Sequence, residues 1–421
     1  RMLFIIIILK KKFLNRCLPF NNKKIERALM STFYRMSLIV FLATCLGIGV
    51  FRFSYTALMP IMIEQYHWTH DFASYLGSAN LLGYLIGALF ALLSIKEKYI
   101  PPLIVLSAIA GSLSLLCCSF MDMPLVWFIV WRTISGIAGG LLMILAPSFA
   151  MKYTPNTQRL KVNFLGFSGI GVGVLSATII IPLLKNMPVH YVWNIFAGIS
   201  LLGSLTLYRL LSRNTAQIIK PQSSALQVSQ KSGLGLVIII AYMCSAFAYI
   251  PHSLFWMDYL SGTLHFPLQQ RNLFWVLYGV GSCIGALVAY CLSRLIRYLQ
   301  AIKWLYAIYS LAVVLPFLSH TASLLALSSL LTGLLTPATV FISSYSLLQI
   351  YEHRYQKLWS LATIGFASTQ LLGGVVISTL HHLHWSYAHL FLLGGTVLLF
   401  AVCLLIPLRP SFTSTFGETK S

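Results

Sequence analysis

Acidic residues are scarce in this chain of 421 residues. Only 8 Asp and Glu stand against 29 Lys and Arg, and charged residues make up 9% of the sequence. An ordinary soluble domain carries about 25% charged residues, so this composition excludes a typical soluble globular protein. The net charge of +21 does not indicate a nucleic-acid partner, because the basic residues lie between long apolar runs and do not form one patch.

Motifs for metal binding and ATP hydrolysis are also missing. The 8 cysteines show no C-x-x-C spacing and most lie in apolar runs, so we expect no disulfide and no metal-bound thiolate. We expect no other cofactor. No G-x-x-x-x-G-K-[ST] sequence occurs, and the longest polar stretch between apolar runs is too short for a nucleotide-binding domain. The sequence therefore gives no indication of ATP hydrolysis, and we expect an ion gradient or a substrate gradient as the energy source.

Long apolar runs fill most of the chain, of which 58% is hydrophobic. A helix that crosses a bilayer needs about 20 mainly apolar residues. Twelve runs meet this length, and we predict an all-α membrane protein with twelve transmembrane helices. The predicted spans are 36–63, 72–94, 101–120, 124–151, 162–184, 191–212, 234–260, 272–293, 302–319, 322–350, 358–380 and 386–407.

A polar stretch divides the twelve spans into six and six. We predict a six-helix bundle at 35–212, a cytoplasmic linker at 213–233 and a second six-helix bundle at 234–407. Cytoplasmic tails at 1–34 and 408–421 complete the chain.

An internal repeat supports the division into halves. Residues 83–91 recur at 281–289 with an offset of 198, and residues 166–167 recur at 365–366 with an offset of 199. Two repeats in the same order are typical of secondary transporters. The matching residues of the first pair are Gly83, Ile86, Gly87, Ala88, Leu89 and Ala91 with Gly281, Ile284, Gly285, Ala286, Leu287 and Ala289.

The basic residues predict the orientation in the membrane. With a cytoplasmic N-terminus, nearly all Lys and Arg fall in cytoplasmic loops and tails, where such residues are retained. We therefore predict a multi-pass protein of the cell (inner) membrane with both termini in the cytoplasm. Residues 3–9 form too short an apolar run to span, and Lys10 to Lys12 follow it in the reverse of a signal peptide's charge order. Our hypothesis is that residues 1–29 are not translated and that translation starts at Met30.

Four segments resemble the major facilitator superfamily, and specifically its YbfB/YjiJ-like branch of bacterial transporters. The resemblance covers roughly residues 35–407. It implies two six-helix bundles and secondary transport by alternating access. The segments are GIGVFRFSYTALMP (47–60), SANLLGYLIGAL (78–89), GFSGIGVGV (166–174) and STQLLGG (368–374).

Other superfamily features are partly matched. The segment WRTISGIAGG resembles the superfamily pattern of the fourth helix, which implies that Arg132 is linked to proton coupling. Ala91 stands where the superfamily usually has an Asp of a gating ion pair. Gly169 is followed by Ile170 and not by the Pro of the antiporter signature, so that motif does not support antiport.

Arg52 is the leading candidate for substrate binding. A charged side chain at the centre of a bilayer costs about 2.5–3.5 kcal/mol, so it needs a partner or a wet cavity. Tyr55 and Thr56 share its face at helical spacing and join it in the predicted site. We predict that the guanidinium binds an anionic group of the substrate. The alternative is an Arg bonded to helix carbonyls or to another helix.

Further candidates follow helical spacing in other spans. Asn80 and Tyr84 share one face of the second span, and Gln370 lies near the middle of the eleventh. In the seventh span Tyr249, His252 and Trp256 share one face, and Pro251 is expected to break the helix there. The alternative for all of them is packing between helices.

Proton coupling needs a titratable group, and Asp258 is the only carboxylate inside a predicted span. Asp258 is therefore a predicted coupling residue, with His252 as a further candidate, and the resemblance adds Arg132. The alternative for Arg132 is bonding to neighbouring helices. The alternative for Asp258 is solvation at the membrane surface. The cluster His381, His382 and His384 in an outer loop has no acidic or Cys neighbour, so we predict no metal site there.

Three functions remain open. The first is a secondary active transporter for a small solute, an organic anion, with a proton as co-substrate and the lipid bilayer as surroundings. The second is an efflux pump for lipophilic compounds, indicated by the aromatic interior with few carboxylates. The third is a non-transporting membrane sensor. An enzyme is not expected, because clustered His, Asp and Glu at one membrane face are missing.

Overall fold

A computed structural model describes residues 22–93, 95–184, 187–212 and 232–408. Within these ranges twelve helical segments are long and apolar enough to cross a membrane, in agreement with the predicted number. Most of the predicted linker and of the C-terminal tail lies outside the described residues. Among the described residues the first helix begins at Asn22, before the proposed translation start, and the first candidate span begins at Met30.

The first six spans form the N-terminal half. Its elements are α2 (Asn22–Thr44), the π-helix η1 (Cys45–Val50), α3 (Phe53–Tyr66), α4 (His70–Leu92), η2 (Glu97–Tyr99), α5 (Ile100–Cys117), α6 (Leu125–Lys152), α7 (Asn156–Leu183) and α8 (Val189–Ser212).

The last six spans form the C-terminal half. Its elements are α9 (Ser232–Ile250), the π-helix η4 (Pro251–Phe255), α10 (Trp256–Asp258), the π-helix η5 (Tyr259–Thr263), α11 (Leu268–Leu295), α12 (Tyr298–Leu318), α13 (Ala322–Ile350), η6 (Glu352–Arg354), α14 (Tyr355–His382) and α15 (Tyr387–Leu405).

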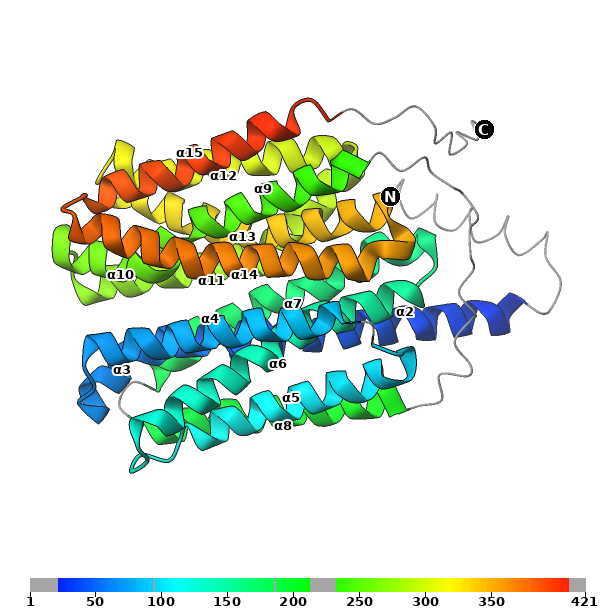
Figure 1. Ribbon diagram of the computed structural model, residues 1–421, viewed down its shortest axis with the longest axis horizontal. Coiled ribbons are helices and arrows are strands. Elements are labelled where there is room, and N and C mark those ends of the chain that lie inside the picture. Colours follow the sequence, from blue (N-terminus) through cyan, green and yellow to red (C-terminus); the bar gives the residue numbers. More distant parts are fainter. Residues whose placement is uncertain (1–21, 94, 185–186, 213–231, 409–421) are drawn as a thin grey trace, which may run out of the picture.

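The two halves lie side by side (Figure 1). Helices α2 to α8 form the lower group in this view, and α9 to α15 form the upper group. Helix α8 ends and α9 begins at the same end of the molecule, at the right of Figure 1, and α15 also ends there. We call this end the linker side and the opposite end the far side.

Glycines of the predicted repeat bring equivalent helices together in both halves. A Cβ atom on Gly83 of α4 would lie 2.1 Å from the carbonyl oxygen of Thr133 in α6. A Cβ atom on Gly281 of α11 would lie 2.1 Å from the carbonyl oxygen of Leu330 in α13. Only a glycine permits so close a backbone approach. The repeat in the sequence is therefore also a repeat in helix packing.

The first span is not the continuous helix that the sequence predicts over 36–63. It changes from α-helix to the π-helix η1, and Phe51 and Arg52 separate η1 from α3. A Cβ atom on Gly49 would lie 2.4 Å from the Cα atom of Gly173 in α7, so η1 packs closely on that helix. The seventh span also changes to a π-helix at Pro251, but it continues through α10 and η5 to Thr263, so Pro251 does not break the helix as predicted.

Candidate functional site

A small cavity lies between the two halves, about midway along the spans. Its volume is about 30 Å³, which is enough for about two water molecules. Side chains of α4, α6, α7, η1 and α3 line it from one half, and side chains of α9, α11, α13 and α14 line it from the other. The lining residues are Ile48, Arg52, Phe53, Tyr84, Met143, Ile170, Val174, Tyr242, Tyr249, Tyr278, Ser282, Thr336, Pro337, Val340 and Phe366.

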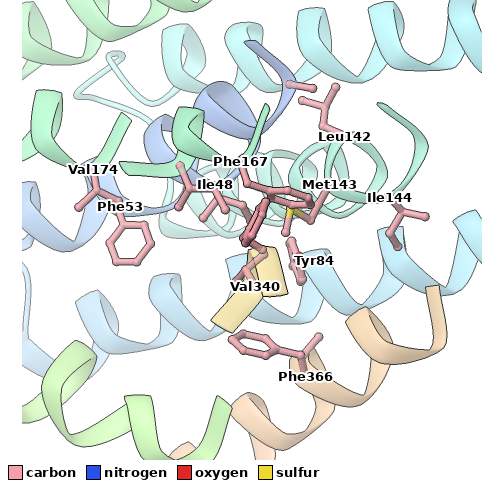
Figure 2. Close-up of a cluster of buried hydrophobic side chains, with 14 of the residues drawn as sticks. Ile48, Phe53, Tyr84, Leu142, Met143, Ile144, Phe167, Val174, Val340 and Phe366 are labelled. Carbon is pink, nitrogen blue, oxygen red and sulfur yellow. The ribbon is translucent and has the colours of Figure 1, made fainter. Parts of the chain in front are cut away.

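Apolar and aromatic side chains form most of the cavity wall. Figure 2 shows Tyr84 and Met143 of the N-terminal half next to Val340 and Phe366 of the C-terminal half. Residues far apart in the sequence thus meet at this cavity. A solute larger than two waters can occupy it only when side chains move or the halves separate.

Arg52 brings a positive charge to this cavity. Its Cζ atom lies 5.7 Å from the ring centroid of Phe53 and 5.9 Å from that of Tyr249. Both rings attract the guanidinium weakly through their π faces. In the described parts of the chain, the Arg52 guanidinium has no hydrogen bond to a protein atom and no carboxylate partner. Its hydrogen-bonding capacity is therefore open to a ligand.

The break in the first span is what positions Arg52, and a buried network holds that break. The carbonyl oxygen of Phe51 accepts hydrogen bonds from Arg132 Nη1 at 2.9 Å and from Ser135 Oγ at 3.0 Å. Asn80 Nδ2 also donates to it at 3.5 Å. Only 1% of the Arg132 residue surface is exposed. The sequence analysis offered a bond to a helix carbonyl as the alternative role of Arg52. In the structure Arg132, and not Arg52, makes such a bond.

Tyr55 lies beside this network and not in the cavity. Its hydroxyl donates to the carbonyl oxygen of Ala73 at 2.6 Å, and Arg132 Cζ lies 4.5 Å from its ring centroid. Thr56 is half-buried, Asn80 is fully buried, and neither lines the cavity. The predicted polar face assumed continuous α-helical spacing, and the π-helix η1 with the break after it changes that spacing.

Tyr84 and Tyr249 do line the cavity, as the sequence predicts for a substrate face. Sequence analysis missed Tyr242, Tyr278 and Ser282. The internal repeat could have identified two of them. At the offset of 198, Tyr278 corresponds to Asn80 and Ser282 corresponds to Tyr84, and both Asn80 and Tyr84 were predicted site residues.

His252 and Trp256 form a separate cluster inside the C-terminal half. Their rings stack with centroids 4.7 Å apart, and both side chains are buried. The hydroxyl of Ser328 donates to the carbonyl oxygen of Ala312 at 2.7 Å, so His252 Nε2, at 2.9 Å from Ser328 Oγ, acts as the donor. Neither ring belongs to the cavity lining.

Gln370 and Asp258 also lie apart from the cavity. Gln370 is buried in α14, and its Oε1 atom has no hydrogen-bond partner in the described residues. Asp258 is exposed at the end of α10 on the far side. The structure therefore brings Arg52, Tyr84 and Tyr249 together from the predicted set.

Contacts between the halves close the linker side. Arg159 Nη2 lies 2.7 Å from Glu352 Oε1, and Trp359 Nε1 donates to the carbonyl oxygen of Met143 at 3.0 Å. The rings of Phe164 and Tyr290 stack with centroids 4.8 Å apart. Each of these contacts joins one half to the other, so in this conformation the linker side is closed.

Ala91 replaces the Asp that the superfamily usually has near the loop between the second and third spans, but another carboxylate, that of Glu97, is present there. Glu97 pairs with Lys152 at 2.6 Å and accepts a hydrogen bond from the hydroxyl of Tyr153. Burial, together with the bond to Glu97, raises the pKa of Tyr153 to about 12, so this hydroxyl stays protonated. The pair lies within the N-terminal half and ties the end of α6 to η2, between the second and third spans.

Comparison with known proteins identifies the family. A family model described as "Uncharacterised MFS-type transporter YbfB" matches residues 44–406. The chain belongs to this family of the major facilitator superfamily (MFS). It is therefore a multi-pass membrane protein of a transporter family, whose members bind small-molecule substrates within a lipid bilayer and in general are not enzymes. No curated protein sequence gives a significant match.

Solved MFS structures share the fold. The proton:xylose symporter XylE bound to 6-bromo-6-deoxy-D-glucose superposes with a TM-score of 0.70 at 15% identity, covering 91% of this chain and 97% of the symporter. The human organic anion transporter MFSD10 (TETRAN) also gives 0.70 at 15% identity, covering 89% and 99%. A bacterial homologue of the iron transporter ferroportin in the outward-facing state gives 0.66 at 14% identity, covering 89% and 98%. At these identities the likeness establishes the fold, and the MFS architecture of two six-helix bundles is confirmed.

Proposed function

We propose that this MFS protein is a secondary active transporter that moves a small organic anion by alternating access. The observation that carries the proposal is the Arg52 guanidinium, which lines the central cavity without a hydrogen bond or a carboxylate partner in the described residues. A guanidinium in low dielectric is stabilised by an anion, and its geometry matches a carboxylate in two parallel hydrogen bonds.

Alternating access is supported by how the halves meet. The ion pair Arg159–Glu352 and the bond from Trp359 to Met143 join the halves on the linker side, which we propose is cytoplasmic. These contacts must break for a solute to leave the cavity toward that side. The cavity of about 30 Å³ also requires the halves to separate for loading.

Efflux of lipophilic compounds is the second candidate. The observation that favours it is the cavity wall, in which rings of Phe53, Tyr84 and Phe366 face a mainly apolar lining. Such a wall binds apolar ligands through burial and ring stacking and needs no anionic group.

The test compares Arg52→Gln with a matched control, Arg294→Gln. Arg294 is exposed near the end of α11 and lies outside the cavity lining, so its substitution removes the same charge elsewhere. Purified full chain is screened by thermal shift against organic anions, neutral solutes and lipophilic cations. At a ligand concentration of 100 times Kd, binding raises the free energy of unfolding by about 2.7 kcal/mol.

We expect organic anions to stabilise the parent and Arg294→Gln but not a folded Arg52→Gln variant. The same anions are then expected to show counterflow in proteoliposomes. Stabilisation by lipophilic ligands alone, equal in all three proteins, would overturn the anion proposal in favour of efflux. Anion binding without any counterflow would instead favour a membrane sensor.

A further inference from the structure

Arg52 is the only charged side chain that lines the described cavity. The other polar groups there are hydroxyls, and those of Ser282 and Thr336 donate to carbonyl oxygens of α13. A ligand that brings one negative charge neutralises the cavity. A second carboxylate on the ligand would be buried against rings and aliphatic chains without a counter-charge, which is strongly unfavourable.

Tyr278 offers a second hydrogen bond at the same cavity. Its hydroxyl is buried close to the hydroxyls of Tyr249 and Thr336, but in the described residues it makes no hydrogen bond of good geometry to either. Its ring is held in place by stacking on Trp275, with centroids 5.2 Å apart and an interplanar angle of 9°. A buried hydroxyl without a partner lowers stability. An acceptor atom on a ligand would satisfy it.

The rest of the wall favours a flat apolar ligand body. Rings of Phe53, Tyr84, Tyr249 and Phe366 come from four different helices around the cavity. Aromatic rings prefer to contact other rings edge to face or in offset stacks, and such contacts add to the free energy gained by burial alone.

We propose that the ligand is a singly charged aromatic carboxylate, held by Arg52 and by a hydrogen bond from the hydroxyl of Tyr278. This inference rests on the proposed function. It specifies that the transported anion carries a single negative charge and an aromatic ring. Tyr278 is then a specificity residue that the sequence did not single out.

The first experiment compares four probes by thermal shift and by Kd on the purified full chain. Benzoate has the proposed chemistry, benzamide has the ring without the charge, terephthalate has a second carboxylate, and acetate lacks the ring. We expect benzoate to bind at least about tenfold more tightly than each of the other three, which corresponds to about 1.4 kcal/mol.

The outcomes separate this inference from the proposed function. If terephthalate binds as tightly as benzoate and Arg52→Gln abolishes both, anion transport stands and the single charge is wrong. If acetate binds as tightly as benzoate, the proposed requirement for an aromatic ring is wrong. If no anion binds, or if Arg52→Gln binds anions like the parent, the proposed function itself fails.

A second experiment tests Tyr278 with Tyr278→Phe and the matched control Tyr309→Phe. The Tyr309 hydroxyl lies 2.9 Å from Thr336 Oγ1 and Tyr309 is not part of the cavity lining. We expect Tyr278→Phe to weaken benzoate binding about fivefold and to keep or raise the Tm of the ligand-free protein. Tyr309→Phe should lower the Tm and leave benzoate affinity unchanged. Unchanged benzoate affinity in Tyr278→Phe would overturn the role of this hydroxyl.

Discussion

Arg159 of α7 and Glu352 of η6 form an ion pair at 2.7 Å that joins residues 193 positions apart in the sequence. The Arg159 side chain is 9% exposed and the Glu352 side chain 31% exposed. Arg159 also donates from Nε to the carbonyl oxygen of Thr154 at 3.1 Å, which fixes its direction. The pair is therefore better ordered and less screened than a surface ion pair.

Breaking this pair is expected to open the linker side. We predict that Arg159→Ala and Glu352→Ala each favour the linker-open conformation by about 1 kcal/mol, because the ion pair exists only when the halves meet. The measurement is the labelling rate of Met143→Cys by an impermeant maleimide, with the native cysteines replaced by alanine. The exchanged double variant Arg159→Glu with Glu352→Arg should restore slow labelling. Equal labelling rates in all variants would contradict a closing role.

The contact between α7 and α11 gives a second prediction. A Cβ atom on Gly171 would lie 2.0 Å from the carbonyl oxygen of Ser282, so Gly171→Ala must push these helices apart. Overpacking of this kind costs about 1–3 kcal/mol. We expect a lower Tm and faster labelling of Met143→Cys in Gly171→Ala.

Gly198 is the matched control for that substitution. A Cβ atom there would meet nothing within 4 Å. Alanine is the better helix former by about 0.8–1.0 kcal/mol, so Gly198→Ala should keep or raise the Tm. An equal loss of Tm in both variants would mean that the contact between the halves is not responsible for it.

Arg132 gives a third prediction, because structure and resemblance suggest different roles for it. Its bond to the Phe51 carbonyl holds the break that positions Arg52. Hydrogen bonds to charged groups contribute about 1.5–3 kcal/mol, so Arg132→Gln should lose about this much stability and also weaken anion binding. Thermal unfolding and benzoate Kd measure the two effects. A variant with parental Tm and Kd that has lost only proton-driven uptake would instead support the coupling role.

Asp258 carries the prediction of proton coupling. It is exposed on the far side, where it can exchange protons with solvent. In proteoliposomes with a pH gradient, we expect Asp258→Asn to abolish accumulation of the anion and to preserve counterflow, which needs no proton movement. The control is Asp122→Asn, since Asp122 is exposed in the loop between α5 and α6. Gradient-driven accumulation at the parental level in Asp258→Asn would show that this carboxylate is not the coupling group.

The sequence predicted the parts of the fold that depend on composition and repeats. Apolar length predicted twelve spans, and glycines such as Gly83 and Gly281 revealed equivalent helix contacts because only a glycine fits there. Helical spacing failed around Arg52, since a π-helix and a break change which side chains share a face. Spacing along one helix also cannot report contacts between halves, so the ion pair Arg159–Glu352 was not predicted.

Asn80 and Tyr278 are equivalent positions of the repeat, but their side chains make different contacts. Asn80 and Tyr278 both lie under a glycine of the neighbouring helix, since Cβ atoms on Gly136 and Gly333 would lie 2.0 Å and 2.1 Å from their carbonyl oxygens. Yet the Asn80 side chain donates to the Phe51 carbonyl oxygen in the first span, whereas the Tyr278 side chain lines the cavity. The two copies of the repeat thus place a helix-to-helix hydrogen bond at one position and a cavity-lining side chain at the other. Exchanging the two side chains should therefore damage both halves, even though their backbones pack alike.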